Sequence, residues 1–295
     1  MIPRKQSYGL FIFTCLLLVS TTYLFYLDFK SSKKDLIFAI LDVGQGDALF
    51  IESPTGTQIL FDVGPPRKIL SGLARVMSPF DRHIDAIVIT NPDADHIGGF
   101  NDILKTYNVD MVFEPGTIND SKVSKNLEAE IKNKKIQNIL VKKGMRIDIG
   151  GGAVIDILFP DQDVSTWDTN DGSIVAKLSY GQTSIMLTGD STSKTEKIIL
   201  DNHKKTARQD LAGIKSTILK VGHHGSRTST SDSFVKAVAP TYAIVSNGKD
   251  NKYGHPHRET LNTLAKFGVK VLRTDLLGTI IMKSDGKKES FIFQK

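Results

Sequence analysis

Residues 90–99 read TNPDADHIGG and follow directly on the apolar run IDAIVIT at residues 84–90. The β-branched residues of this run are typical of a buried strand, so two aspartates and a histidine stand where the strand ends. Asp93 and Asp95 point to the same side of an extended loop, and two carboxylates held together need a cation to neutralise them. The stretch therefore indicates a divalent metal site. The alternative is a turn in which both aspartates cap the helix that follows.

Other strand-like runs end in the same way. Asp190 closes TSIMLTGD, His223 and His224 close STILKVGHH, and His255 and His257 stand in the turn YGHPH after YAIVSNG. Two adjacent side chains of an extended segment cannot both enter one core, so the histidine pair is not a core feature. Functional side chains gather where the strands of an open sheet end. We therefore expect these residues to meet around one centre.

The rest of the chain alternates between short strand-like runs, turns and helical stretches from residue 36 to residue 295, without a long linker. The runs fall into two series, LIFAILDV to VDMVFEP and NILVKKG to TSIMLTGD, followed by an alternation of strands and helices. This pattern predicts one α/β domain at residues 36–295, built as two packed sheets with helices outside. A hydrophobic helix at the amino terminus is expected to precede it.

The composition limits the kind of metal site. Cys15, the single cysteine, lies in the amino-terminal hydrophobic run, which excludes a disulfide framework and a thiolate cluster in the folded part. A metal must therefore be held by nitrogen and oxygen ligands. The net charge of +6 suits phosphate-rich partners or an anionic membrane, and it equally suits an ordinary lysine-rich surface.

Residues 9–27, GLFIFTCLLLVSTTYLFYL, carry no charge and follow Arg4 and Lys5. Nineteen residues at helical rise just cross a hydrocarbon core. We expect residues 1–35 to be an uncleaved single-pass anchor and a linker, with the catalytic domain on the outer side of the cell membrane. The alternative is a cleaved signal peptide that releases a secreted domain.

A resemblance to a known family rests on six ordered motifs: LDVGQGDA, ITNPDADHIGG, NDGSIV, LTGD, LKVGHHGSRTSTS and SNGKDNKYGHPH. The series resembles the metallo-β-lactamase fold and, within it, the hydrolase domain of ComEC-type DNA-internalisation competence proteins. It covers essentially all of residues 36–295. The resemblance implies an αββα sandwich with a metal site, commonly dinuclear, along one edge.

The resemblance also assigns metal ligands, which are Asp93, Asp95, His96, Asp190 and His223. His224 is the alternative to His223, and Asp190 matches the bridging carboxylate. Asn91 stands where the wider family has histidine, and an amide oxygen binds zinc far less well than an imidazole, although manganese accepts it. We therefore expect one or two ions of zinc or manganese, with the position near Asn91 weak or lost. Asn170 or Asp171 could partly replace the missing imidazole.

The expected reaction is hydrolysis by a metal-activated water, most simply of a phosphodiester such as DNA. Asp95 also orients that water, and His255 is the candidate general acid, with His224 second. The candidate substrate-binding residues are Lys220, Ser226, Arg227 and Asn247. Hydroxyls and arginine suit a phosphate diester, although the run at residues 226–231 also reads as a solvated turn with a helix cap. Asp47 is expected to support the metal loop without binding the ion.

Two alternatives remain open. The same metals could hydrolyse another ester, such as an envelope phosphodiester, or the chain could be a degenerate membrane-tethered binding domain in which Asn91 marks lost catalysis. Retention of Asp190, of both histidines of HHGS and of YGHPH argues against a degenerate domain. The fold alone does not imply that the protein hydrolyses β-lactams.

Overall fold

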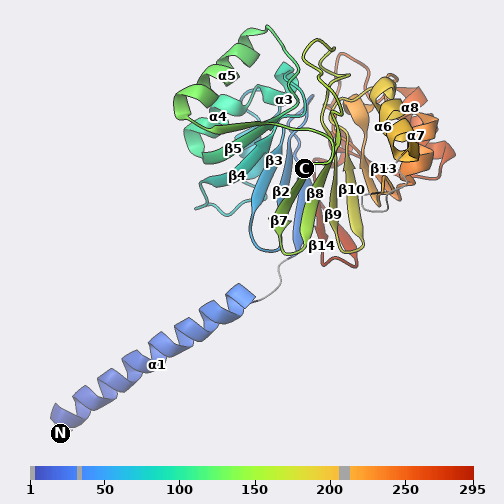
Figure 1. Ribbon diagram of the computed structural model, residues 1–295. Helices are drawn as coiled ribbons and strands as arrows, with labels where there is room; N and C mark the ends of the chain where they lie inside the picture. The colour runs from blue at the N-terminus through green and yellow to red at the C-terminus, as the bar shows by residue number, and fades with distance from the viewer. Residues whose placement is uncertain (1–3, 32–34, 206–212) are drawn as a thin grey trace. The chain divides into compact units, whose positions relative to one another are not determined.

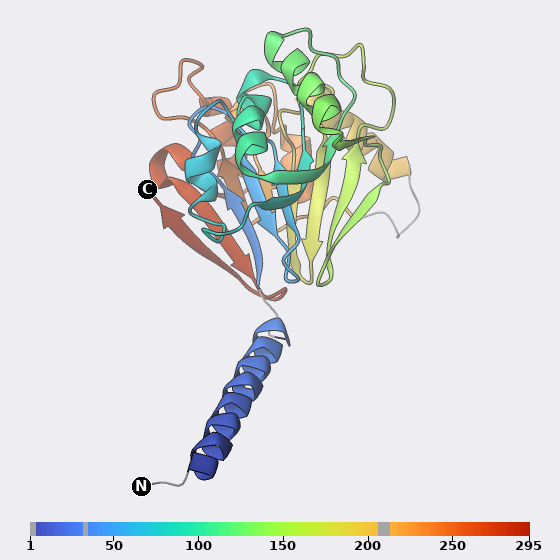
Figure 2. The same cartoon turned by 90° about the vertical axis from the view of Figure 1, so that its left-hand side faces the viewer.

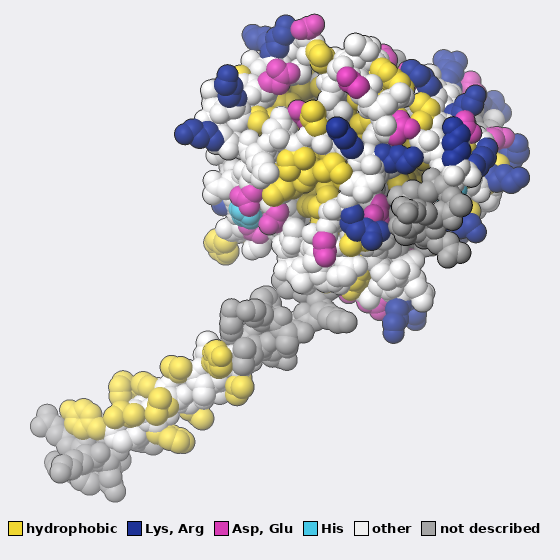
Figure 3. Space-filling view, in the orientation of Figure 1, with side chains coloured by type: hydrophobic (Ala, Val, Ile, Leu, Met, Phe, Trp, Pro, Cys, Tyr) yellow, Lys and Arg dark blue, Asp and Glu magenta, His cyan; other side chains and the backbone are white. Residues whose placement is uncertain are grey.

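The computed structural model describes residues 4–31, 35–205 and 213–295. The chain divides into two units, Met1–Lys34 and Asp35–Lys295. The first unit holds one helix, α1 (Arg4–Ser31), whose described side chains are largely hydrophobic (Figure 3). Of the helices in the described ranges, none has both the length and the apolar character needed to cross a bilayer. Residues 9–27, from which the membrane anchor is expected, lie within this first helix.

The second unit is built on two sheets. The larger is eight-stranded, in the order β15–β14–β1–β2–β3–β4–β5–β6, and the smaller is seven-stranded, in the order β13–β12–β11–β10–β9–β8–β7. The strands are β1 (Leu36–Ile40), β2 (Leu49–Glu52), β3 (Gln58–Phe61), β4 (His83–Val88), β5 (Asn108–Glu114), β6 (Gln137–Leu140), β7 (Arg146–Gly150), β8 (Ala153–Phe159), β9 (Val175–Tyr180), β10 (Thr183–Leu187), β11 (Ile218–Lys220), β12 (Tyr242–Val245), β13 (Lys270–Arg273), β14 (Thr279–Ser284) and β15 (Glu289–Gln294).

Helices cover the outer face of each sheet (Figure 1). Seen from the side of the larger sheet, α4 and α5 lie in front of its strands (Figure 2). The helical segments of this unit are α2 (Ile69–Leu73), α3 (Ala94–Ile97), α4 (Phe100–Thr106), α5 (Lys122–Lys134), α6 (Ser193–Lys205), the 3-10 turn η1 (Gly222–Gly225), α7 (Asp232–Val238), α8 (Arg258–Lys266) and α9 (Thr274–Leu277).

Three apolar clusters explain the layers. Strand β8 reads AVIDILF, and every second residue from Ala153 to Phe159 is buried while the residues between are only partly covered. Side chains from the inner faces of both sheets, such as Phe38 and Ile157, form the central core. Phe100 packs in a cluster between the larger sheet and its helices, and Phe234 packs in the equivalent cluster on the smaller sheet. The predicted αββα sandwich is confirmed.

Strand direction determines where the functional loops lie. The series β3–β4–β5–β6 pairs in parallel, and so does the series β10–β11–β12–β13. The carboxyl ends of parallel strands meet at one edge of a sheet. Residues that follow β3, β4, β10, β11 and β12 are therefore placed to converge. On the face seen in Figure 3, basic and acidic side chains are interspersed over the second unit.

Candidate metal centre

The imidazole of His96 is fixed between two carboxylates. It is fully buried at the start of α3, with Nδ1 2.7 Å from Asp62 Oδ2 and Nε2 3.1 Å from Asp190 Oδ2. Asp62 in turn accepts hydrogen bonds from the backbone N–H of Thr90 (2.7 Å) and from its hydroxyl (2.5 Å). A carboxylate on one ring nitrogen fixes the tautomer and directs the other nitrogen to a metal. The arrangement presents Nε2 of His96 to the centre of the cluster.

An unusual backbone conformation directs the side chains of His223 and His224 apart. His223 (φ 46°) and His224 (φ 53°) both adopt the left-handed conformation in η1. Non-glycine residues reach this region at a cost of about 1–3 kcal/mol each and are concentrated at functional sites. The turn sends the two adjacent rings in different directions, at 71° to each other.

His224 is the member of the pair that enters the cluster. Its Nδ1 lies 3.0 Å from Ser246 O and 3.3 Å from Asp47 Oδ1, and its Nε2 lies 3.4 Å from both Asp95 Oδ2 and Asp190 Oδ2. His223 remains 25 % exposed, with Nε2 3.9 Å from Asp190 Oδ2 and Nδ1 3.2 Å from Thr228 Oγ1. The geometry thus favours the alternative histidine over His223, the ligand preferred from the sequence.

Three spacings within the cluster are of the size found around a bound ion. Ligand atoms bound at about 2.0–2.2 Å to a tetrahedral zinc ion lie about 3.3–3.6 Å apart. Asp190 Oδ2 lies 3.1 and 3.4 Å from the Nε2 atoms of His96 and His224, and Asp95 Oδ2 lies 3.4 Å from the latter. Neither Nε2 atom makes a well-formed hydrogen bond with any described residue. Two imidazoles and two carboxylates are a suitable donor set for zinc or manganese.

The cluster concentrates negative charge. Burial alone would lower the pKa of His224, but Asp190 and Asp47 raise it to about 10. Burial likewise opposes the charged form of His96, and the carboxylates of Asp190 and Asp62 raise its pKa well above the ordinary value. Against the effect of burial, the two imidazoles hold the pKa of Asp190 well below its usual range. In the metal-free protein protonated rings balance the acids, and a divalent ion would replace those protons.

Lys220 supplies a further positive charge from inside the fold. Its ammonium group forms an ion pair with Asp47, donates to Gly189 O at 2.9 Å and lies 3.9 Å from Asp190 Oδ1. Burial would raise the pKa of Asp47, but Lys220 and His224 lower it to about 2. Asp47 is brought close by Gly46, where a Cβ atom would lie 2.2 Å from Asp95 O. Lys220, expected from the sequence to bind substrate, is only 1 % exposed and contacts the acids of the cluster.

Around Asn91 and Asp93, in contrast to the cluster around His96 and His224, the polar side chains are already hydrogen-bonded to neutral groups. Asn91 Oδ1 accepts from the backbone N–H of Asp93 (2.9 Å), and its Nδ2 approaches Asn170 Oδ1 and Ser173 Oγ, each at 3.4 Å. The carboxylate of Asp93 accepts from Thr169 Oγ1 (3.0 Å to both oxygens) and from Asn119 Nδ2 (2.9 Å). These polar atoms hydrogen-bond to one another. Asp171, the second candidate to replace the missing imidazole, instead pairs with Lys194 at 2.9 Å.

The remaining predicted substrate residues are divided between the interior and the surface. Asn247 is buried, and its Nδ2 donates to Gly248 O (3.4 Å) and His255 O (3.3 Å), so it holds a loop together. Ser226 is also buried, and its hydroxyl accepts from the Thr228 hydroxyl at 3.0 Å. Both side chains are thus buried and hydrogen-bonded within the protein. Arg227 is exposed, 3.8 Å from Glu259, and stays available to a substrate.

His255 lies beside the cluster without joining it. Its ring centroid is 6.4 Å from that of His224 and 5.6 Å from that of His223. Burial and the neighbouring imidazoles of His224, His257 and His223 lower the pKa of His255 to about 4. At neutral pH the ring is therefore neutral in the metal-free protein. It can donate one N–H hydrogen bond, but it does not carry the extra proton that the expected general acid requires.

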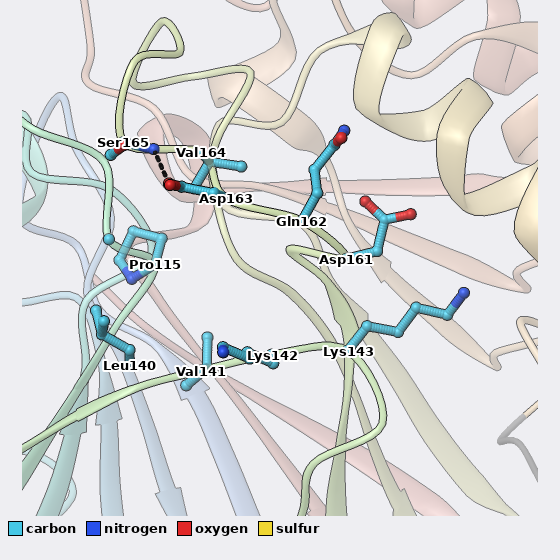
Figure 4. Close-up of a pocket in the computed structure, with 11 residues that line it drawn as sticks. Pro115, Leu140, Val141, Lys142, Lys143, Asp161, Gln162, Asp163, Val164 and Ser165 are labelled. Atoms are coloured by element: carbon cyan, nitrogen blue, oxygen red, sulfur yellow. Dashed lines mark hydrogen bonds between the residues drawn. The ribbon is translucent and has the colours of Figure 1, made fainter.

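A separate pocket of about 630 Å³ opens between the loops that follow β5, β6 and β8 (Figure 4). Lys142 and Lys143 line one side, and Asp161 and Asp163 line the other, where Asp163 accepts from the backbone N–H of Ser165 at 2.8 Å. The candidate ligands, all within the described ranges, do not line it. The pocket thus belongs to the loop edge and not to the metal cluster.

Asp62 is the residue that the sequence analysis missed. It follows β3 in the run TQILFDVG, so the signal was the one used elsewhere, an acid at the end of a buried strand. The backbone of Asp62 has a positive φ of 58°, a conformation that the sequence does not reveal. Asp62 and His96, together with Asp47 and His224, form two carboxylate–imidazole pairs that aim at the same point.

Comparison with known proteins agrees with this geometry. Residues 41–249 match the family described as the metallo-beta-lactamase superfamily. The chain is 31% identical over 259 residues to ComE operon protein 3 of Bacillus subtilis (strain 168), a match that covers 82% of this chain and 32% of that protein. It is 27% identical over 242 residues to Competence protein ComA of Neisseria gonorrhoeae, covering 82% and 31%. The chain spans about a third of the length of these curated relatives.

Among solved structures, the metallo-beta-lactamase fold protein YhfI from Bacillus subtilis aligns with a TM-score of 0.51 and 13% identity, over 80% of this chain and 96% of that one. Identity this low supports the fold alone. The family match covers more than half of the sequence, including the loops that carry the cluster as far as residue 249. The chain therefore belongs to the metallo-β-lactamase superfamily.

Proposed function

We propose that the chain is a metal-dependent phosphodiesterase that cleaves DNA, using one divalent ion held by Asp95, His96, Asp190 and His224. The observation that carries the proposal is the convergence of two imidazole nitrogens and two carboxylates, with neighbouring ligand atoms 3.1–3.4 Å apart. The similarity to two proteins from competence systems favours DNA as the substrate. The net charge of +6 suits a polyanion.

A divalent ion bound there would supply a water that loses its proton near neutral pH and would polarise the phosphoryl oxygen. Asp62 and Asp47 hold the rings of His96 and His224 so that both Nε2 atoms face inward. Asp95, whose side chain is 35 % exposed, is the cluster acid open to solvent and is placed to orient the attacking water. His224 serves as a ligand in this scheme and is not free to act as an acid.

His255 acts in its neutral form. Its ring stands next to those of His223 and His224, beside the cluster. A neutral imidazole donates an N–H hydrogen bond to a departing oxygen and stabilises its developing charge. The proton that completes departure then comes from solvent. Arg227, which is exposed, is available to contact a neighbouring phosphate.

The test is a nuclease assay on the full chain, stripped of metal and then supplied with zinc, manganese or magnesium in turn. We expect DNA cleavage with zinc or manganese, and a loss on the order of 10³-fold in Asp95→Ala. Asp120→Ala is the matched control, because Asp120 is an exposed acid whose ion pair, within the described part of the chain, is with Lys125.

An inert wild-type chain with every ion would refute the enzymatic proposal. Metal analysis distinguishes the degenerate alternative, since a binding domain without catalysis would retain less than about half an equivalent of ion after purification. Equal activity in Asp95→Ala and wild type would also refute the assignment.

A further inference from the structure

The loop between β12 and α8 presents an aromatic side chain on a rigid support. Asn251 closes the loop: its Oδ1 accepts from His255 N (3.0 Å), and its Nδ2 donates to Gly248 O (2.9 Å) and His255 O (2.7 Å). Gly254 N also donates to Asn251 O at 3.2 Å. Every one of these bonds is made within the loop. The loop is therefore shaped before any ligand arrives.

Tyr253 stands at the tip of this loop. Its ring stacks on His255, with centroids 5.6 Å apart and planes at 23°, yet the residue is 51 % exposed. His255 in turn lies 6.4 Å from the ring of His224. His255 thus neighbours both His224 of the cluster and the exposed Tyr253, each within the distance at which aromatic rings interact. A large apolar ring held open to solvent beside a reaction centre is a surface for a flat ligand.

The charges around Tyr253 identify that ligand. The ammonium group of Lys252 lies 5.0 Å from the centroid of the Tyr253 ring. From Gly248 to Arg258 the sequence carries three basic residues and one acidic residue. A quaternary ammonium headgroup, the other aromatic-binding group found on phosphodiesters, would be repelled by these cations. A nucleotide would be attracted, because its phosphates are anionic and its base has a flat face.

We propose that Tyr253 is a stacking platform for a nucleobase next to the scissile phosphate, and that the preferred substrate is single-stranded. The inference rests on the proposed function and names the form of its substrate. In a duplex both faces of each base are covered by neighbouring bases, so only an unpaired strand offers a base to this ring. Lys252 supplies the accompanying contact with the backbone.

The experiment measures binding separately from cleavage. Fluorescence anisotropy of a labelled single-stranded oligonucleotide is recorded with the full chain, stripped of metal to prevent cleavage, for wild type, Tyr253→Ala and Tyr253→Phe. We expect Tyr253→Ala to weaken binding by about tenfold and Tyr253→Phe to stay within about twofold, because phenylalanine keeps the stacking face. An oligonucleotide with one abasic position, scanned along the strand, should lose a similar factor at one position in wild type and little in Tyr253→Ala.

Each outcome decides the inference. Equal affinity of Tyr253→Ala and wild type, tighter binding of duplex than of single strand, or no single-strand binding at all would overturn it. Displacement of the labelled oligonucleotide by phosphocholine at a lower concentration than by a mononucleotide would also overturn it. The ring would then be assigned to quaternary ammonium headgroups. Ring-dependent binding without cleavage under any ion would uphold the platform and refute only the proposed phosphodiesterase.

Discussion

One loop carries two positions that could hold an ion, and they are built in opposite ways. At the position of Asp95 and His96, ring nitrogens and carboxylate oxygens converge with little hydrogen bonding among themselves. At the position of Asn91 and Asp93, the amide and carboxylate oxygens are engaged by Thr169, by Asn119 and by the loop backbone. The residues are at most five positions apart in the sequence.

The contrast teaches that ligand type alone does not make a metal site. An acid such as Asp93 is chemically able to bind an ion, but its lone pairs already accept hydrogen bonds from neutral donors. At the other position buried acids are balanced by imidazoles and by Lys220. Burying charge without such partners is costly, and an ion bound here would take over the part played by the protons on the two rings. The following predictions test that difference.

The adjacent histidines give the largest expected effect. His224→Ala should abolish metal retention and reduce DNA cleavage on the order of 10³-fold, because it removes a ring that faces two carboxylates. His223→Ala, its matched control, should keep the ion and lose less than about tenfold in rate. Metal content by mass spectrometry and single-turnover cleavage measure the two effects. If the two variants behaved in the reverse way, His223 would be the ligand.

The carboxylate behind His96 should matter next. Asp62→Asn keeps the shape but removes the charge that orients the ring, and we expect metal affinity to fall about 10–100-fold. Competition against a chromogenic chelator measures the affinity. Asp110→Asn, which changes a largely exposed acid on β5, should leave it unaltered. An unchanged affinity in Asp62→Asn would show that the cluster does not depend on this support.

Restoring an imidazole should make the two positions more alike. We expect Asn91→His to raise bound manganese or zinc from about one toward about two ions per chain, because a ring nitrogen replaces a poor amide ligand. The gain should be lost when Asp93→Asn is added. Isothermal titration of the metal-free chain gives the stoichiometry. A wild-type chain that already binds two ions would remove the contrast between the positions.

The charges around Asp95 and His96 also shift the pKa of His255. The resulting change in the free energy of unfolding is the smallest effect we predict. The pKa of His255 is lowered to about 4 from 6.5 by burial and by His224, His257 and His223, with Asp190 opposing. Between pH 6.5 and 4 the unfolded chain binds the proton and the folded chain does not, so stability falls as the pH falls through this window.

The variant His255→Gln should remove that part of the acid sensitivity. We expect the free energy of unfolding of the metal-free wild type to drop by about 1–3 kcal/mol more than that of the variant over this range. Urea unfolding at several pH values measures the difference, and above pH 7 the two slopes should agree. Parallel curves throughout would mean that His255 titrates normally.

Much of the fold could be predicted because it follows from local patterns. Strand runs such as AVIDILFP and YAIVSNG mark β8 and β12, and the lysine- and glutamate-rich stretch at residues 121–137, whose spacing is helical, contains α5. The strand β15 was not predicted, because its alternation of exposed and partly covered residues in ESFIFQ is weak. The hydrophobic run at residues 9–27 predicts a membrane anchor from its composition, and among the described residues no helix combines the length and the apolar character needed to cross a bilayer.

Some members of the candidate site were predictable, but Asp62 and the details of the geometry were not. Strand ends identified Asp95, His96 and Asp190, since those positions depend on topology alone. The choice between His223 and His224 depends on two consecutive left-handed residues, a conformation that neither side chain favours and that no spacing reveals. Lys220 was expected to bind substrate, although its place inside the apolar run ILKV is the sign of a buried ion pair.

That buried ammonium has a consequence for how the protein acquires its ion. Lys220 gives Asp47 and Asp190 a resident counter-ion that no chelator can extract. Small zinc modules must fold around their metal because their ligands have no other partner. We therefore expect the polypeptide to fold before the ion is loaded, in which case the supply of metal would control when the finished chain begins to work.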